Sequence, residues 1–153
     1  MPKLYMLIGV PASGKSTWVE KYKGDALVIS SDDLIEAYAA EQGKTYNEVF
    51  KEQIKIATKI MLEHAEAAFA ADQDVIWDQT NLTAKGRAAK LNIVPEHYEK
   101  VAMVFSVPGR EEWLRRLDSR PGKTIPRNIL EGMLSTQQMP TEEEGFHDIV
   151  VVS

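Results

Sequence analysis

The sequence contains no cysteine, which excludes a disulfide framework, a thiolate metal site and a cysteine nucleophile. Long hydrophobic runs are also missing: the longest early run, residues 4–10, is too short to span a bilayer and has too little flanking charge for a signal peptide. Basic residues are the minority, 18 against 23 acidic ones, so a polyanion would need a local basic patch. These absences predict a cytoplasmic protein without membrane contact, in keeping with a reducing compartment.

What the sequence does contain is typical of one soluble globular domain. Its 153 residues are 44% hydrophobic and 27% charged, which excludes disordered and fibrous classes. No internal repeat and no Pro/Gly/Ser-rich linker divides the chain, so we expect residues 1–153 to form a single domain.

Short apolar runs alternate with helical patterns along the chain. The runs are nearly continuous, as in strands buried on both faces; they are residues 3–9, 26–30, 74–78, 101–107 and 148–152. The predicted helices are residues 15–22, 31–40, 110–117 and 129–138, with a long helix after Thr45. This alternation predicts an α/β fold, a three-layer α/β/α sandwich around a parallel sheet of about five strands. Ligands bind such sheets at the carboxyl ends of the strands.

The long helix has a start signal and an apolar stripe. Thr45 and Glu48 form the T-x-x-E pattern of a capping box. Apolar residues then follow at steps of three and four, which predicts one buried face. These are Phe50, Ile54, Ala57, Met61, Ala65 and Ala68.

Residues 9–16, GVPASGKS, match the phosphate-binding pattern G-x-x-x-x-G-K-[ST] in full, directly after a predicted strand and at the start of a predicted helix. The alternative, an accidental glycine turn, does not account for that context. Backbone N–H groups of the loop would face phosphate oxygens. Lys15 would reach the β- and γ-phosphates of ATP or another nucleoside triphosphate, the Ser16 hydroxyl would ligate Mg²⁺, and Thr17 would lie near the α-phosphate. The predicted nucleotide-binding residues of the loop are Gly9, Pro11, Ala12, Ser13, Gly14, Lys15, Ser16 and Thr17.

Other motifs narrow the class of phosphate-loop protein. The GTPase patterns D-x-x-G and N-K-x-D and the protein-kinase patterns H-R-D and D-F-G do not occur. What remains is a small phosphotransferase, which needs a carboxylate for the acceptor hydroxyl, a positive lid and an acceptor pocket. Asp32 and Asp33 follow the second predicted strand. We expect Asp32 to be the catalytic carboxylate and Asp33 to lie nearer the helix cap, which is the alternative role for either residue.

A basic segment supplies the candidate lid. Residues 110–127 hold six basic residues against three acidic ones, and Pro121-Gly122 interrupts the helical pattern. Arg116 and Arg120 are four residues apart and share a helix face if the helix continues. A solvated charged face is the alternative, but the local sign excess and the break favour a mobile lid at about residues 109–127.

Four segments together resemble a known family. They are GVPASGKSTW, ISSDDL, WDQTNLTAKGR and RRLDSRPGKTIP, which lie in order between about residues 4 and 133. They are similar to the kinase domain of phage polynucleotide 5′-hydroxyl kinases, within a broader group of small P-loop phosphotransferases that includes zeta-toxin-like proteins. The resemblance implies a P-loop kinase fold, ATP as the phosphoryl donor and Mg²⁺.

The resemblance also implies a role for each matching residue. Lys15 and Ser16 match the phosphate and metal ligands, and Asp32 matches the general base for the 5′-hydroxyl. On the acceptor side, the matching residues are Asp78, Asn81 and Arg87. Arg120 matches the lid arginine that contacts the transferred phosphate, with Arg116 beside it, so that Lys15, Asp32 and Arg120 form the expected catalytic set.

The chain departs from the phage motif at two positions. Ile35 stands where the phage enzyme has an arginine that grips the phosphate of the acceptor, and Gln79 adds one residue between Asp78 and the T-N pair. The loss of the arginine weakens the case for a nucleic-acid acceptor without affecting the case for phosphoryl transfer.

Three hypotheses about function therefore stand. The first is an ATP-dependent polynucleotide 5′-hydroxyl kinase whose partner is a DNA or RNA 5′ end. The second is the same chemistry on a nucleoside, nucleotide or other small hydroxyl compound, and the third is a nucleotide-binding module without catalysis. Nothing in the sequence indicates an oligomeric state.

Overall fold

The computed structural model describes residues 1–107, 109–120 and 122–152. Its strands are β1 (Lys3–Ile8), β2 (Leu27–Ile29), β3 (Val75–Trp77), β4 (Glu99–Phe105) and β5 (Asp148–Val152). Its helices are α1 (Lys15–Tyr22), α2 (Ser31–Glu41), α3 (Tyr46–Ala70), α4 (Ala84–Leu91), α5 (Arg110–Asp118) and α6 (Arg127–Thr136), with a short 3₁₀ helix, η1 (Glu142–Glu144).

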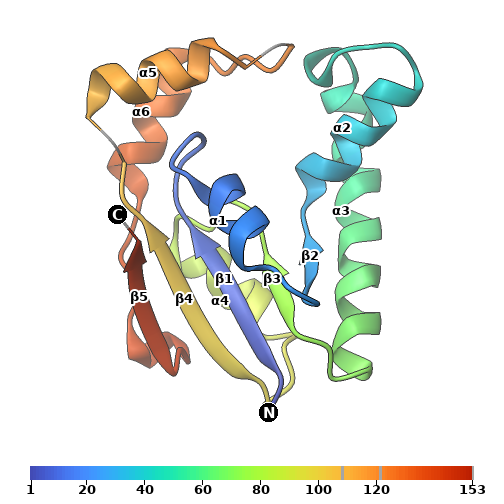
Figure 1. Ribbon diagram of the computed structural model, residues 1–153, viewed down its shortest axis with the longest axis vertical. Coiled ribbons are helices and arrows are strands. Elements are labelled where there is room, and N and C mark those ends of the chain that lie inside the picture. Colours follow the sequence, from blue (N-terminus) through green and yellow to red (C-terminus); the bar gives the residue numbers. More distant parts are fainter. Residues whose placement is uncertain (108, 121, 153) are drawn as a thin grey trace.

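The five strands form one parallel sheet in the order β2-β3-β1-β4-β5 (Figure 1). β1 lies at the centre, where Leu4 pairs with Val75 of β3 and Lys3 pairs with Glu99 of β4. The predicted parallel sheet of about five strands is confirmed. This is the α/β fold of P-loop kinases.

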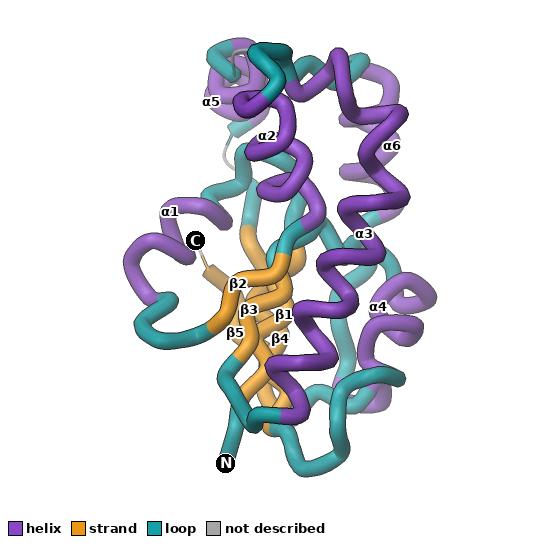
Figure 2. The backbone as a smooth tube through the Cα atoms, turned by 90° about the vertical axis from the view of Figure 1, so that its right-hand side faces the viewer, coloured by secondary structure: helices purple, strands orange, loops and turns teal. Residues whose placement is uncertain are grey.

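Helices cover both faces of the sheet, so the predicted three layers are confirmed (Figure 2). On one face α1 packs Trp18 and Val19 against side chains such as Leu7 and Phe105. On the other face α3 and α4 pack residues such as Met61 and Leu91 against the opposite side of the same strands. Because side chains alternate along each strand, β1 contributes to both layers of the core.

The predicted capping box at the start of α3 is confirmed: the Thr45 hydroxyl accepts from the Glu48 N–H at 3.3 Å, and Glu48 Oε1 accepts from the Thr45 N–H at 2.9 Å. Most of the apolar stripe is buried, but Phe50 is 39% exposed. The prediction that Phe50 lies on the buried face is therefore wrong. Its neighbour Val49 is buried instead.

The hydrophobic periodicity of the sequence did not predict helix α4. Its sequence, AKGRAAKL, holds few apolar residues, and the side chains it buries are Arg87 and Leu91. Thr83 starts this helix by accepting a hydrogen bond from the Gly86 N–H at 3.1 Å. A helix that buries an arginine does not produce an apolar stripe.

The candidate lid segment folds as α5, a connecting loop and the start of α6. A small cluster joins both helices to the phosphate loop: Trp113, Leu117 and Leu130 pack with Val10. Pro121 of the predicted helix break lies outside the described residues; Gly122, which is described, has a φ of +66°. Within the described part of the chain, none of the helices has the length and apolar character needed to cross a membrane.

Candidate active site

The phosphate loop connects the central strand β1 to α1. Gly9 begins the loop and donates its N–H to the Thr80 carbonyl at 3.0 Å. A Cβ at Gly9 would lie 2.8 Å from Ser13 Oγ and 3.0 Å from Phe105 Cβ, so only glycine fits there. The loop turns through left-handed conformations at Ala12 (φ +62°) and Gly14 (φ +104°). It therefore curls tightly above the carboxyl end of the sheet.

The start of α1 is built to receive an anion. Gly14 precedes the helix and supplies no side-chain cap, so the N–H groups of the first turn lack an intrahelical partner. Among the described residues, two buried side-chain atoms also lack a hydrogen-bond partner, Ser13 Oγ and Arg120 Nη1. Because buried polar atoms are nearly always paired, these donors fit a bound triphosphate. Ser16 and Thr17 are exposed on the same turn, where the Ser16 hydroxyl is open to Mg²⁺.

Lys15 is the charged centre of the site. Its Nζ donates to the Gly9 carbonyl at 2.5 Å and contacts the Val10 carbonyl at 3.4 Å. Burial lowers the pKa of Lys15 to about 8, although the nearby carboxylates of Asp78 and Asp32 act in the opposite direction. The positive charges of Arg120 and Lys123 also reach Lys15. The fold therefore brings Asp32, Asp78 and Arg120, all predicted site residues, around the phosphate loop.

Asp32 lies in the first turn of α2. Neither aspartate caps that helix, because Ser30 is the cap and accepts from the Asp33 N–H at 3.3 Å. The Tyr46 hydroxyl donates to Asp32 Oδ1 at 2.7 Å, and Lys123 Nζ lies 3.3 Å from Oδ2. The Asp32 side chain is 49% exposed. It is thus an oriented carboxylate that an acceptor hydroxyl can reach.

Asp78 directly follows β3. Burial raises its pKa, while the charge of Lys15 opposes the rise. The extra residue in the motif, Gln79, has a structural role: its side chain accepts from Trp77 Nε1 at 3.0 Å and donates to Ser31 Oγ at 2.9 Å. The wider spacing of the motif therefore fastens β3 to α2.

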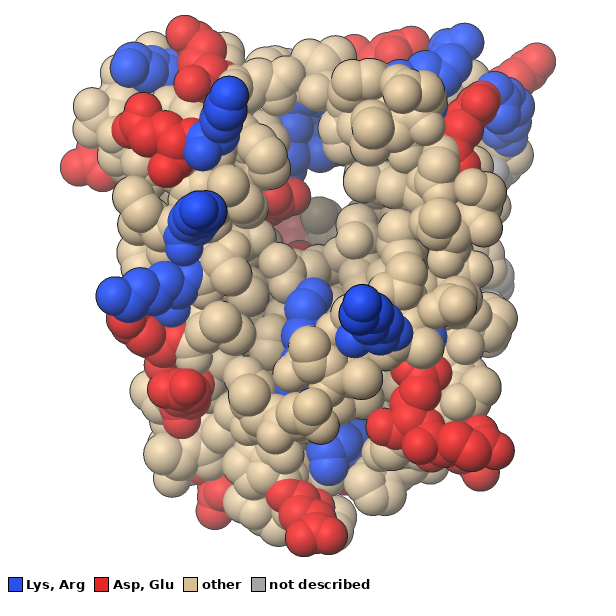
Figure 3. All heavy atoms as spheres, turned by 180° about the vertical axis from the view of Figure 1, so that it is seen from behind, with Lys and Arg blue, Asp and Glu red and all other residues tan. Residues whose placement is uncertain are grey.

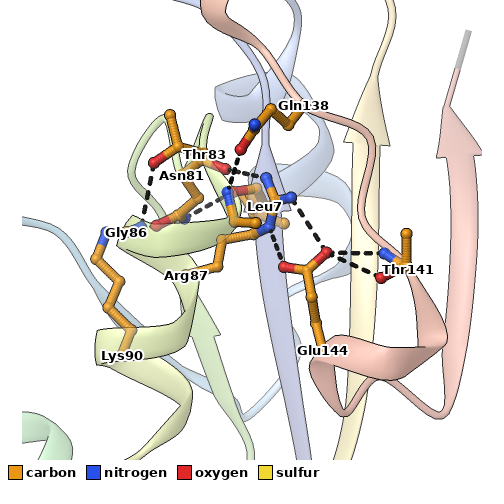
Figure 4. A network of polar contacts seen from close by, with 10 residues as sticks. Leu7, Asn81, Thr83, Gly86, Arg87, Lys90, Gln138, Thr141 and Glu144 are labelled. Carbon is orange, nitrogen blue, oxygen red and sulfur yellow. Dashed lines mark hydrogen bonds and ion pairs between the residues drawn. The ribbon is translucent and has the colours of Figure 1, made fainter.

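Asn81 is buried instead of facing an open acceptor site (Figure 4). Its Nδ2 donates to the Leu7 carbonyl at 2.7 Å, and Lys90 Nζ donates to its Oδ1. Its φ of +48° is unusual for a residue other than glycine. In this structure the side chain ties the segment after β3 to the end of β1.

Arg87 is fully buried, which corrects the expectation of a basic group on the acceptor surface. Its Nε and Nη2 donate to the two carboxylate oxygens of Glu144 at 2.8 and 3.3 Å, and Nη1 donates to the Asn81 carbonyl at 2.9 Å (Figure 4). The sequence offered no signal for this pair, because Glu144 lies in an acidic run, residues 142–144, 57 residues away from Arg87.

Helix α5, part of the candidate lid segment, is attached directly to the phosphate loop. Trp113 Nε1 donates to the Pro11 carbonyl at 2.7 Å, and Arg116 Nη1 contacts the Ala12 carbonyl at 3.4 Å. Arg116 also pairs with Glu112, at 3.0 Å. Trp113 was not a predicted site residue; its indole is completely buried.

The loop after α5 reaches across to α2 and α3 and adds a cation that was not assigned from the sequence. Lys123 Nζ lies 2.8 Å from Glu36 Oε1 as well as 3.3 Å from Asp32 Oδ2. From behind, the molecule has an opening in its upper half, between the side of α3 and the side of α6, with acidic and basic side chains at its edge (Figure 3). The loop therefore links α5 to α2 and passes over the candidate site.

Two curated relatives match nearly the whole of this chain, which spans only part of their own length. The chain is 28% identical to the bifunctional polynucleotide phosphatase/kinase of Schizosaccharomyces pombe, with 96% of the chain and 32% of that protein covered. It is 24% identical to heterogeneous nuclear ribonucleoprotein U-like protein 2 of Mus musculus, with 90% of the chain and 20% of that protein covered. The chain therefore spans between a fifth and a third of these relatives.

Solved structures share the fold. A putative kinase from Chloroflexus aurantiacus superposes with a TM-score of 0.72 at 20% identity, covering 99% of this chain and 84% of that one. A chain of the Pnkp1/Rnl/Hen1 RNA repair complex gives 0.68 at 24% identity, covering 88% and 43%. A gluconokinase from Sinorhizobium meliloti gives 0.58 at 20% identity, covering 99% and 82%.

Residues 4–140 match the family described as AAA domain, AAA_33. That match includes the phosphate loop, Asp32, Asp78 and helix α5. The chain belongs to this family of P-loop domains.

Proposed function

We propose that the protein is an ATP-dependent kinase that transfers the γ-phosphate of ATP to a hydroxyl group. The observation that carries the proposal is the placement of Asp32, an exposed and oriented carboxylate, within electrostatic reach of Lys15 in the phosphate loop. A domain that only bound nucleotide would not need such a carboxylate. Residues 109–127 act as the lid of this single domain.

The residues divide the reaction between them. Asp32 accepts the proton of the acceptor hydroxyl while the oxygen of that hydroxyl forms a bond to the γ-phosphorus. The bond from the γ-phosphorus to the oxygen that bridges it to the β-phosphorus breaks, and ADP leaves. Lys15, Arg116 and Arg120 stabilise the negative charge on the transferred group. Mg²⁺ held at Ser16 would neutralise charge on the phosphate oxygens. Asp78 lies on the acceptor side, facing Lys15.

The first candidate acceptor is the 5′-hydroxyl end of a polynucleotide. Three facts support it: the resemblance of four ordered motifs to phage polynucleotide 5′-hydroxyl kinases, the similarity to a bifunctional polynucleotide phosphatase/kinase, and the shared fold with a chain of an RNA repair complex. The lid cations Arg120 and Lys123 would then contact the nucleic acid or the transferred phosphate.

Three observations favour a second candidate, a small hydroxyl compound. Ile35 is completely buried, so its position does not face an acceptor. The guanidinium of Arg87 is paired with Glu144, so it is not free to bind an acceptor phosphate. The surface beside Asp32 also carries Asp33 and Glu36, which is unfavourable for a strongly anionic acceptor.

Transfer of labelled γ-phosphate tests the proposal. The acceptors are a 5′-hydroxyl oligonucleotide, its 5′-phosphorylated twin, free nucleosides, 3′-mononucleotides and gluconate, each with ATP and Mg²⁺. Label on the 5′-hydroxyl oligonucleotide alone supports the first candidate, and label only on small compounds supports the second. Absence of transfer to every acceptor contradicts kinase activity.

The variant that tests Asp32 as the base is Asp32→Asn. We expect it to lower kcat at least about 10²-fold because the base is lost, while ATP affinity, measured by calorimetry, stays within a factor of about two. Glu41→Gln, at the far end of α2, is the control and should behave as the parent protein. Near-normal transfer by Asp32→Asn would show that another group accepts the proton.

A further inference from the structure

The tip of the lid, residues 122–124, lies against the first turn of α3. The Asn47 N–H donates to the Gly122 carbonyl at 3.1 Å. The Asn47 side chain then exchanges hydrogen bonds with Thr124: Nδ2 donates to the carbonyl at 3.2 Å and to Oγ1 at 3.1 Å, and Oδ1 accepts from the Thr124 N–H at 3.3 Å. One asparagine thus pairs with the lid backbone much as a neighbouring strand would.

The shapes of the two surfaces also fit closely. Gly122 adopts a φ of +66°, and a Cβ at this position would lie 2.8 Å from Thr45 Cβ. Thr45 is the residue that caps α3. The lid tip therefore touches the start of α3 at a point where a side chain would prevent the contact.

Docking of the tip places one charge against the candidate base. Lys123 is 14% exposed, lies 3.3 Å from Asp32 Oδ2, and stands 4.6 Å from the centroid of the Tyr46 ring. Asp32 and Glu36 are one helical turn apart, so their carboxylates repel each other unless a cation lies between them. Lys123 from the lid and the Tyr46 hydroxyl from α3 together hold the Asp32 carboxylate.

Docking also completes a groove lined by Glu36, one helical turn along α2 from Asp32. The groove has a volume of about 350 Å³, and its walls come from α2, from the start of α3 and from Gly122 and Lys123 of the tip. Without the tip, one wall of the groove would be missing. The contacts that hold the tip are mainly polar and partly exposed, so water competes for them and they are readily broken and remade.

We propose that docking of the lid tip on the start of α3 is the step that orients Asp32 toward the acceptor, and that Asn47 is the positioning residue that holds the tip through Thr124. The inference rests on the proposed function of Asp32. In the undocked state Asp32 keeps its bond from Tyr46 but loses Lys123. Acceptor chemistry is then coupled to closure of the lid, while the phosphate loop stays complete.

The test combines a distance with a rate. Because the chain has no cysteine, nitroxide labels at Ser119→Cys and Lys55→Cys report the separation of the lid from α3 by pulsed electron paramagnetic resonance. Asn47→Ala is compared with Lys51→Ala, an exposed position one turn further along the same helix. ATP affinity and the kcat and KM for the acceptor found by γ-phosphate transfer are measured in the same proteins.

We expect one short distance in the labelled parent and in Lys51→Ala, and a second, longer population in Asn47→Ala. In Asn47→Ala, kcat should fall about tenfold, the effect of losing hydrogen bonds at an exposed contact, with ATP affinity unchanged. Unaltered distances, or a displaced tip with an unaltered kcat, would overturn the inference. A docked tip in a protein that phosphorylates no acceptor would instead overturn the proposed function and the role assigned to Asp32.

Discussion

Lys15 illustrates how burial prepares a single residue for its ligand. Because the pKa of Lys15 is about 8, its amine is neutral in about half of the molecules at pH 8. A bound triphosphate brings negative charge against the amine and raises its pKa, because an opposite charge favours the charged form. ATP binding should therefore be coupled to protonation of this residue.

This coupling predicts proton uptake on ATP binding. At pH 8 we expect uptake of up to about half a proton per site, since about half of the Lys15 amines are neutral there. At pH 6.5 the amine is already charged and uptake should vanish. Calorimetric titration in buffers of different ionisation enthalpy measures the difference.

Two variants identify the group that takes up the proton. Lys15→Met should abolish the uptake. Lys90→Met should retain it: burial also lowers the pKa of Lys90 to about 8, but Lys90 donates to Asn81 and not to the phosphate loop. Equal uptake at both pH values in the parent would contradict the assignment to Lys15.

The residues that could be predicted from the sequence are those whose role is indicated by their neighbours along the chain. The phosphate loop is a contiguous motif, and Asp32 follows a strand that ends at the same edge of the sheet, so the fold brings Asp32 within electrostatic reach of Lys15. Tyr46, Lys123 and Trp113 could not be assigned, because each acts on a partner in another element. Trp113 contacts Pro11, for example, across most of the chain.

Among the elements, α4 and η1 depend on one buried ion pair. Arg87 is completely buried and Glu144 is 13% exposed at the side chain. Burial alone would raise the pKa of Glu144, but hydrogen bonds from Arg87 and Thr141 hold it below its usual value. The pair fastens the segment before β5 to the helix behind the sheet (Figure 4).

Removing the charge of Glu144 should therefore weaken the whole fold. Glu144→Gln leaves the Arg87 charge buried without a counter-ion, and we expect the free energy of unfolding to fall by about 3 kcal/mol. Glu143→Gln, the exposed neighbour, is the control and should change stability by less than about 0.5 kcal/mol. Urea denaturation at pH 7 measures both.

The same pair gives a pH dependence with a defined sign. Because the folded pKa of Glu144 is depressed, its stabilisation is present above the unfolded pKa, about 4.3, and is lost as the pH falls through the lower folded value. The stability difference between the parent protein and Glu144→Gln should therefore shrink below about pH 4. A difference that stayed constant down to pH 2 would contradict the pairing.

The long elements were predicted better than the short ones. The α3 helix carries its own start signal and a clear stripe from Ala57 to Ala68, whereas Phe50 near its start faces solvent. The α4 helix is stabilised by contacts to η1 and to Asn81 that no local pattern contains. β4 begins two residues earlier than predicted, because Glu99 pairs with Lys3 at the polar end of the sheet.

For the whole molecule, net charge decides how an acceptor is attracted. The chain carries a formal charge of −5, and the cation paired with Asp32 is Lys123, from the loop after α5. If the acceptor is a polynucleotide, one or two phosphate contacts should give a slope of about −0.7 to −1.4 for log kcat/KM against log salt. General repulsion, which salt screens, makes the slope shallower still.

The measurement uses saturating ATP and compares a dinucleotide with a twenty-residue oligonucleotide, both with 5′-hydroxyl ends. Similar, shallow slopes for both are expected, since the contacts cluster at the end of the strand. A steep slope for the longer strand alone would contradict the expectation that the contacts cluster at the end of the strand.

The strand order has a consequence for how the chain matures. β1 is made first, yet its neighbours in the sheet are β3 and β4, and Lys3 meets its partner Glu99 only after most of the chain has been synthesised. Pairings of such long sequence separation form slowly. The phosphate loop, at the end of that strand, therefore cannot be complete until β4 has been synthesised. Because nucleotide binds the folded loop, ATP would stabilise only chains in which β1 has already paired with both β3 and β4.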